Sequence, residues 1–137
     1  MNFSVLGAGA WGTAVAVYLS KQSHVVTLVP RRMEQALCLS SERTNQEYLP
    51  GVVFSGDLQI GCSLRPVVME SDYLFMACPS HALRETCRSV VAFEDDFAQL
   101  KGVIALCKGL EPDTNKFAHE VIQDVFGSSV SSGYLTG

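Results

Sequence analysis

The sequence predicts an α/β domain built on a mainly parallel sheet with helices on both faces. Short apolar runs alternate with stretches of helical periodicity along the chain, which is typical of α/β folds. The apolar runs are continuous and rich in β-branched residues, as expected for strands buried on both faces. Hydrophobic residues make up 47% of the 137 residues and charged residues 18%, so the chain can bury a core and fits one domain.

The first half of the chain predicts strand, helix, strand, helix and then a loop. Residues 3–6 form a strand that runs directly into a glycine, and residues 10–21 form a helix. Four residues of that helix fall on one face: Ala10, Ala14, Val17 and Tyr18. Residues 25–29 predict a second strand ended by proline, and residues 32–40 can form a helix. Residues 41–56 show no clear period and contain turn-forming residues, so a loop is predicted.

The second half continues the alternation. Residues 58–61 predict a strand, followed by a short helix around residues 67–69 and a central strand over residues 73–77. Pro79 and Ser80 open the next helix, with Ser80 as its expected N-cap. The inner face of that helix is expected to hold Leu83, Cys87, Val90 and Val91.

Three further elements complete the pattern. Residues 103–106 predict another buried strand, which ends at Lys108 and Gly109. Apolar residues at four-residue spacing then predict a helix that Gly127 ends: Phe117, Val121 and Val125. A last strand is expected to begin at about residue 133.

Charge, apolar runs and cysteines exclude several classes of function. The net charge of −4 argues against nucleic-acid binding, which needs a basic face. The apolar start has no preceding basic residues, and no run of about 18 apolar residues occurs, so neither a signal sequence nor a membrane span is expected. The five cysteines show no C-x-x-C spacing, which favours structural thiols in a reducing cytoplasm over disulfides or a metal site.

A glycine-rich turn follows the first predicted strand. Gly7, Gly9 and Gly12 form a G-x-G-x-x-G pattern between that strand and an alanine-rich helix, within one βαβ length. The first glycine permits the tight turn, the second lets a pyrophosphate approach the backbone, and the third lets helix and sheet pack closely. The helix N-terminus adds free N–H groups and partial positive charge. The pattern indicates a Rossmann-type, doubly wound sheet that binds a dinucleotide.

The end of the second strand bears on which dinucleotide binds. A site selective for NAD usually places a carboxylate there for the ribose 2′-hydroxyl. This sequence has Arg31 and Arg32 instead, and its first carboxylate is Glu34. Guanidinium groups bind a 2′-phosphate through forked hydrogen bonds, so NADP is favoured over NAD. The alternative is that both arginines are merely solvated at a helix start.

Two more strand ends carry polar groups where ligands of open α/β sheets bind. Pro79 and Ser80 follow the central strand and are expected beside the cofactor. Lys108 follows the next strand, where its ammonium group can reach an anionic substrate. An ordinary surface lysine is an equally good interpretation of that position alone.

The sequence resembles the bacterial-type NAD(P)-dependent glycerol-3-phosphate dehydrogenases over its whole length. Four segments in order carry the resemblance: residues 7–14 (GAGAWGTA), 45–51 (NQEYLPG), 79–80 (PS) and 108–111 (KGLE). The second and fourth are the more specific, because other Rossmann dehydrogenases lack them.

The resemblance implies roles for individual residues. Ala10, Trp11, Arg31, Arg32 and Tyr48 would line the cofactor site, and Lys108 would contact both cofactor and substrate. Gly137 would lie at the substrate, in a turn where Thr136 replaces the usual serine. Cys78 replaces a commoner valine before Pro79.

The resemblance also implies a reaction: reversible hydride transfer between NAD(P)H and dihydroxyacetone phosphate, giving sn-glycerol 3-phosphate for phospholipid synthesis. In this family a helical C-terminal domain carries the catalytic lysine and most phosphate contacts, and the whole protein is expected to be a homodimer. We therefore expect residues 1–137 to be a single NAD(P)-binding domain that lacks turnover by itself.

Two other functions remain open on the sequence alone. One is a related β-hydroxyacid-type dehydrogenase or ketopantoate reductase, which shares the glycine turn and the strand-end proline. The other is a non-catalytic module that senses a dinucleotide, which the chain length also fits.

Overall fold

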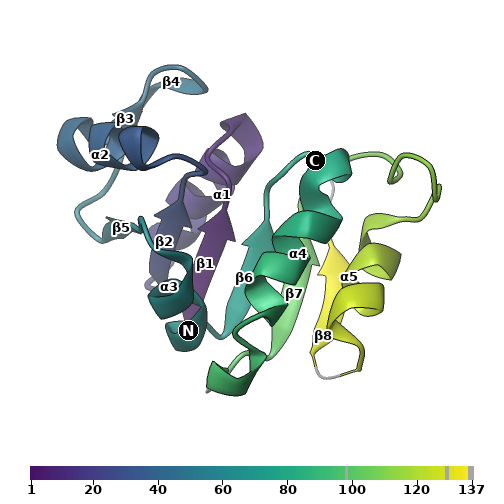
Figure 1. Cartoon of the computed structure of the whole chain (residues 1–137). Helices are drawn as coiled ribbons and strands as arrows, with labels where there is room; N and C mark the ends of the chain where they lie inside the picture. Colours follow the sequence, from purple (N-terminus) through teal and green to yellow (C-terminus); the bar gives the residue numbers. More distant parts are fainter. Residues whose placement is uncertain (98, 129, 136–137) are drawn as a thin grey trace.

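A six-stranded sheet forms the centre of the molecule, in the order β5-β2-β1-β6-β7-β8 (Figure 1). The computed structural model describes residues 1–97, 99–128 and 130–135. All neighbouring strands in this sheet run parallel. The strands are β1 (Asn2–Leu6), β2 (Val25–Val29), β5 (Leu58–Ile60), β6 (Tyr73–Met76), β7 (Gly102–Ala105) and β8 (Ser131–Tyr134). The strand order reverses between β1 and β6, as in a doubly wound sheet.

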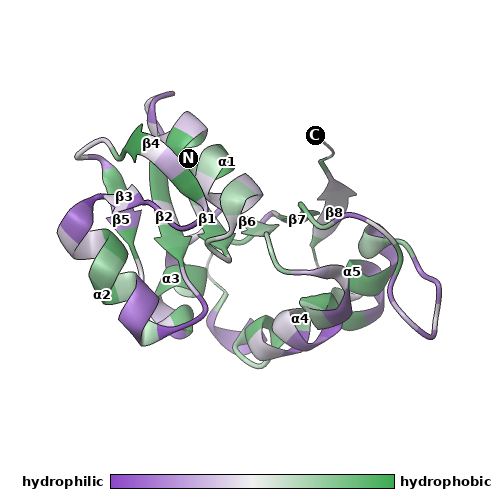
Figure 2. Cartoon of the chain, turned by 90° about the horizontal axis from the view of Figure 1, so that it is seen from above, coloured by the Kyte–Doolittle hydropathy of each residue, from purple (hydrophilic) through white to green (hydrophobic). Residues whose placement is uncertain are grey.

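Helices cover the two faces of the sheet, with α1 on one side and α4 and α5 on the other (Figure 2). The α-helices are α1 (Ala10–Ser20), α2 (Met33–Glu42), α3 (Leu64–Glu70), α4 (Leu83–Val91) and α5 (Ala118–Phe126). Two short 3-10 turns, η1 (Ser80–Ala82) and η2 (Glu94–Asp96), flank α4.

Each face of the sheet has its own apolar core. Val5 and Leu6 are consecutive in β1, yet Val5 packs with α1 and Leu6 packs with α4 and α5. Phe75 and Met76 divide between the two cores in the same way. Successive strand side chains point to opposite faces, so a sheet covered on both sides needs unbroken apolar runs. The predicted Rossmann-type fold is confirmed.

The buried face of α1 differs from the one predicted. Of the four residues assigned to one face, only Val17 is buried, and Tyr18 is 63% exposed. The residues that α1 buries are Gly12, Thr13, Val15, Ala16, Val17 and Ser20. Small side chains let this helix lie close to the sheet, so size decides the packed face more than hydrophobicity does.

The predicted loop over residues 41–56 is wrong in part, because much of it is regular. Helix α2 continues to Glu42 and ends at Arg43, whose φ is +59°. An antiparallel hairpin follows, formed by β3 (Thr44–Asn45) and β4 (Leu49–Val53). Its two strands form a separate two-stranded sheet, and β4 leaves most of its residues at least partly exposed. A hairpin without two buried faces has no strong apolar period for the sequence to reveal.

Two predicted helix starts and one strand start need correction. Ser80 makes no capping hydrogen bond; it begins η1, where the Ala82 N–H donates to the Pro79 carbonyl (2.9 Å). The backbone turn itself supplies the acceptor, so no side-chain cap is needed there. Helix α5 begins at Ala118, and β8 begins at Ser131 rather than at about residue 133. Leu83, Cys87 and Val90 are buried as predicted, with Val91 packed against their core.

In the described part of the chain, no helix is both long and apolar enough to cross a membrane. The prediction that the cysteines are structural holds for Cys87, which is buried, but Cys38 and Cys62 are exposed. All five thiols are free.

Candidate functional site

The glycine-rich turn joins the carboxyl end of β1 to α1 and touches the end of β6. Gly7 has a φ of +113°, and a Cβ on it would lie 2.6 Å from the Ala77 carbonyl oxygen. A Cβ on Gly12 would lie 2.5 Å from the Gly7 carbonyl oxygen and 2.6 Å from the Ala77 Cβ. Both positions therefore require glycine, the first for its backbone conformation and both for close packing.

The middle glycine has a different role. A Cβ on Gly9 would meet nothing within 4 Å, and its φ of −77° suits any residue. Gly9 is the N-cap of α1, and no side chain caps the helix there. The first N–H groups of α1 have no acceptor within the helix, and they carry its partial positive charge. Open space thus lies beside uncapped donors, which is the arrangement that holds a phosphate.

Asn45 fixes the hairpin β3–β4 to this turn. Its buried side-chain amide donates to the Ala8 carbonyl (2.9 Å) and to the Thr13 hydroxyl (2.9 Å). Gln35 of α2 donates to the same carbonyl at 3.4 Å. The turn is therefore held from outside the βαβ unit. Asn45 belongs to residues 45–51, one of the more specific segments of the family resemblance, but its side chain could not be assigned a role from the sequence.

We expect Asn45→Ala to lower the free energy of unfolding by about 1–2 kcal/mol, because the buried Ala8 carbonyl loses its best donor. Urea denaturation followed by circular dichroism measures this. Gln46→Ala, at an exposed neighbouring position, is the control and should change stability by less than about 0.5 kcal/mol. Equal stability of the two variants would show that the amide does not hold the turn.

Two arginines follow β2, the strand next to β1. The Gly7 N–H donates to the Val29 carbonyl (2.8 Å), which ties the end of β2 to the glycine turn. Arg31 and Arg32 follow Val29 after a single residue, Pro30, and both are exposed. Arg32 is the N-cap of α2, where positive charge opposes the helix dipole. Neither arginine is in an ion pair among the described residues.

The other predicted site residues lie at the same edge of the sheet. The in-register pairing of Leu6 with Met76, and of Met76 with Ala105, aligns the ends of β1, β6 and β7. Pro79 and Ser80 follow β6, and Lys108 follows β7 with its side chain exposed. Trp11, in the first turn of α1, is 37% exposed, and Tyr48, at the tip of the hairpin, is 44% exposed.

An ion-pair network holds the loop that carries Lys108. Arg84 of α4 donates hydrogen bonds to both carboxylate oxygens of Glu111, each at 2.9 Å, and to the carboxylate of Asp124 of α5 at 3.0 Å. Thr114 donates to Glu111 at 2.6 Å. The Arg84 guanidinium is the main cause that holds the pKa of Glu111 below its usual range. Bidentate pairs fix orientation as well as distance, so the loop is set by α4 and α5.

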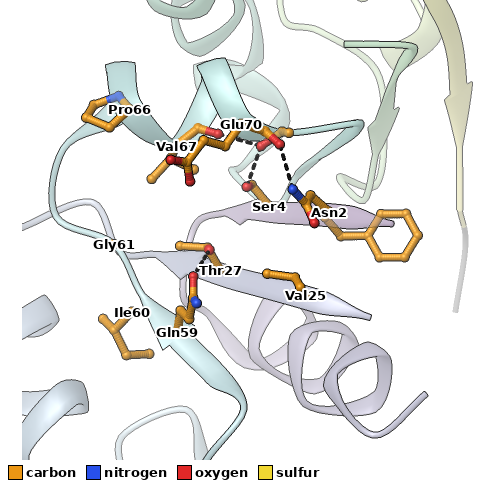
Figure 3. A pocket seen from close by; sticks show the side chains of 12 residues that line it. Asn2, Ser4, Val25, Thr27, Gln59, Ile60, Gly61, Pro66, Val67 and Glu70 are labelled. Carbon is orange, nitrogen blue, oxygen red and sulfur yellow. Dashed lines mark hydrogen bonds between the residues drawn. The ribbon is translucent and has the colours of Figure 1, made fainter. Parts of the chain in front are cut away.

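One pocket lies elsewhere and contains none of the predicted site residues (Figure 3). This cavity of about 180 Å³ lies between α3 and the strands β1, β2 and β5. Its polar side chains bond to one another: Thr27 donates to Gln59 (3.1 Å), and the hydroxyls of Ser4 and Ser71 are 2.6 Å apart. Ligands of open α/β sheets bind at the carboxyl ends of the strands instead. The glycine turn is therefore the better candidate.

The structure thus brings most predicted residues to one edge of the sheet. They are Gly7, Gly9, Ala10, Trp11, Gly12, Arg31, Arg32, Pro79, Ser80 and Lys108, with Tyr48 on the attached hairpin. Gly137 and Thr136 lie outside the described residues. The residues that sequence reasoning missed are supporting ones, chiefly Asn45, Arg84 and Ala77.

Comparison with known proteins relates this chain to glycerol-3-phosphate dehydrogenases, both in sequence and in structure. Residues 2–137 match the family profile described as NAD-dependent glycerol-3-phosphate dehydrogenase N-terminus. A glycerol-3-phosphate dehydrogenase (NAD(P)+) of Pelodictyon phaeoclathratiforme is 43% identical over 125 residues, which are 91% of this chain and 37% of that protein. The crystal structure of glycerol-3-phosphate dehydrogenase from Coxiella burnetii has a TM-score of 0.81 at 26% identity, covering 93% of this chain and 38% of that one. The chain spans well under half the length of these relatives.

The ketopantoate reductase alternative receives weaker support. A structure described as a probable 2-dehydropantoate 2-reductase from Bacillus subtilis has a TM-score of 0.63 at 22% identity, which shows a shared fold alone. The profile match, in contrast, extends over nearly the whole chain and includes the hairpin and the Lys108 loop. The chain belongs to the family of NAD-dependent glycerol-3-phosphate dehydrogenase N-terminal domains.

Proposed function

We propose that this chain is the dinucleotide-binding domain of an NAD(P)-dependent glycerol-3-phosphate dehydrogenase. The observation that carries the proposal is the open space over Gly9 beside the uncapped N-terminus of α1. Gly7 and Gly12 keep the backbone close to β6, and Asn45 holds the turn from the hairpin. A pyrophosphate would receive hydrogen bonds from the first turn of α1, with Ala10, Trp11 and Tyr48 around the cofactor.

The substrate is proposed to be dihydroxyacetone phosphate or sn-glycerol 3-phosphate. A bound nicotinamide supplies or accepts the hydride at the carbon of the carbonyl or alcohol. Lys108 would attract the anionic substrate to the end of β7, and Pro79 and Ser80 would border the nicotinamide from the end of β6. Arg84 and Glu111 would keep the Lys108 loop in place during binding. Orientation of this kind supplies a large part of the rate in such reactions.

A chimera tests the reaction. This chain would replace the matching segment of the Pelodictyon phaeoclathratiforme relative, of which it covers 37%. The expected result is reduction of NAD(P)+ that depends on sn-glycerol 3-phosphate, with Lys108→Ala raising KM for that substrate. A folded chimera that binds dinucleotide but reduces it only with 2-hydroxy acids would overturn the substrate assignment.

NADP is the proposed preferred cofactor, because Arg31 and Arg32 are exposed after β2 and form no ion pair with any residue that the structure describes. We expect the variant with Arg31→Ala and Arg32→Ala to bind NADPH at least about 10-fold more weakly, since hydrogen bonds between charged groups contribute about 1.5–3 kcal/mol. Its affinity for NADH should change by less than about threefold, because NADH lacks the 2′-phosphate. Isothermal titration calorimetry of the 137-residue chain measures both affinities.

Arg65→Ala is the matched control for this prediction. Arg65 is also an exposed arginine, but it pairs with Asp96 in η2 at 2.9 Å and lies far along the chain from the glycine turn. Both affinities should be unchanged in that variant. Equal losses for NADPH and NADH in the Arg31/Arg32 variant would contradict a 2′-phosphate site while leaving dinucleotide binding intact.

A further inference from the structure

Two cysteines lie side by side at the carboxyl ends of neighbouring strands. β6 and β7 pair in register with Met76 opposite Ala105, and Cys78 and Cys107 each follow two residues later. Side chains of a strand alternate between its faces, so both cysteines continue on the face of Met76 and Ala105. Both accordingly pack against the same apolar cluster, and both remain partly exposed.

The two side chains lie at neighbouring positions of paired strand ends and pack into the same apolar cluster. Neighbouring strands of a sheet are about 4.8 Å apart. A disulfide joins Cα atoms that are about 4.4–6.8 Å apart. The register and the shared packing together place this pair where a disulfide can form with little backbone movement.

The proximity of the two thiols gives them unequal pKa values. The hydrogen bond from Cys107 lowers the pKa of Cys78 to about 7, despite partial desolvation, and the positive charge of Arg31 acts in the same direction. The same contact raises the pKa of Cys107. Cys87 packs in the same cluster, but desolvation raises its pKa to about 12. At neutral pH a thiolate therefore forms most readily at Cys78.

From this arrangement we propose that Cys78 and Cys107 form a modification site at which a peroxide oxidises the two thiols reversibly to a disulfide. The Cys78 thiolate attacks an oxygen of hydrogen peroxide, the O–O bond breaks, and the leaving hydroxide takes a proton to become water. Cys78 is then a sulfenic acid. The Cys107 thiol attacks this sulfur, forms the S–S bond and releases a second water. The two thiols lose two electrons in total, and the peroxide accepts them.

The modification joins two segments at the candidate site. Pro79 follows Cys78 directly, and Lys108 follows Cys107 directly. A disulfide would tie these two strand ends together covalently. The site itself does not depend on the proposed function, because its chemistry requires only the two thiols and a peroxide.

Mass spectrometry of the oxidised chain tests the proposal. The reduced chain is treated with one equivalent of hydrogen peroxide, its remaining thiols are alkylated, and it is digested. The expected product is a peptide pair joined through Cys78 and Cys107, which dithiothreitol separates again. Cys38 and Cys62 are exposed internal controls, which should escape oxidation and therefore be found alkylated. A hydrogen bond to Glu42 raises the pKa of Cys38, which makes that thiol less reactive. Faster oxidation of either control, or a link from Cys78 to Cys87, would overturn the proposal.

Variants separate the two thiol roles. Cys107→Ser, which keeps a hydrogen-bond donor beside Cys78 but has no thiol, should stop the reaction at a sulfenic acid on Cys78, which dimedone traps. Cys78→Val should abolish rapid consumption of peroxide, with Cys78→Ser as a second variant if the valine disturbs folding. Cys62→Ser is the matched control and should still form the disulfide. Rapid peroxide consumption in a folded Cys78 variant would show that another thiol reacts.

Discussion

Gly9→Asp is expected to abolish dinucleotide binding while leaving the fold at least as stable as before. Gly9 is the N-cap of α1, its φ of −77° suits any residue, and a Cβ there meets nothing within 4 Å. Aspartate is a favoured N-cap and its charge suits the helix dipole, so the free energy of unfolding should rise by about 0.5–1 kcal/mol. The same carboxylate would occupy the space proposed for the pyrophosphate and repel it.

The expected loss of NADPH affinity is at least about 100-fold, since like charges about 4 Å apart near a protein surface repel by several kcal/mol. Fluorescence of Trp11, the single tryptophan, reports binding, and urea denaturation reports stability. Gly9→Asn is the matched control: it has nearly the same shape and caps the helix equally well, but it carries no charge. Asparagine should lose clearly less affinity than aspartate. A Gly9→Asp chain that binds NADPH normally would place the dinucleotide somewhere other than this turn.

The sequence is sufficient to predict the parallel sheet but not the hairpin. The strands β1, β2, β6 and β7 carry continuous apolar runs because both of their faces are covered. The hairpin β3–β4 has only partial cover, and its stability depends on the buried amide of Asn45 reaching across to Ala8. A contact between residues that are 37 positions apart leaves no periodic trace in a single sequence.

The residues of the candidate site likewise fall into two groups: those predictable from local sequence and those positioned by contacts between distant elements. Gly7, Gly9 and Gly12 are predictable because their spacing is determined by the local geometry of one strand, one turn and one helix. Arg84 is not predictable, because its role depends on α4 and α5 bringing it to Glu111. The thiol pair likewise exists only because β6 and β7 are neighbours in register. Residues that can bind ligands at strand ends can therefore be identified from the sequence, whereas the residues that position them can be identified only from the fold.

Gly12→Val is expected to destabilise the fold strongly, by about 3 kcal/mol, as overpacking does at a site that cannot relax. The first atom of the new side chain would lie 2.5 Å from the Gly7 carbonyl oxygen and 2.6 Å from the Ala77 Cβ. The carbonyl belongs to the backbone of the turn, so α1 must move away from β6. A side chain within a helix usually stabilises the helix by up to about 1 kcal/mol relative to glycine, so the expected loss is a specific result of packing. Urea denaturation measures the change.

A double-mutant cycle shows whether this packing is the cause. Gly12→Ala should cost less than Gly12→Val, and Ala77→Gly removes one of the two atoms that lie closest to the new Cβ. The combined variant should therefore be more stable than the sum of the single changes predicts, because residues in contact do not act additively. Gly56→Ala is the control: a Cβ there meets nothing within 4 Å, so stability should change by less than about 0.5 kcal/mol. Additive effects of the Gly12 and Ala77 changes would mean that Gly12 serves helix flexibility rather than the close approach of α1 to β6, and the shape of the glycine-rich turn would then need another explanation.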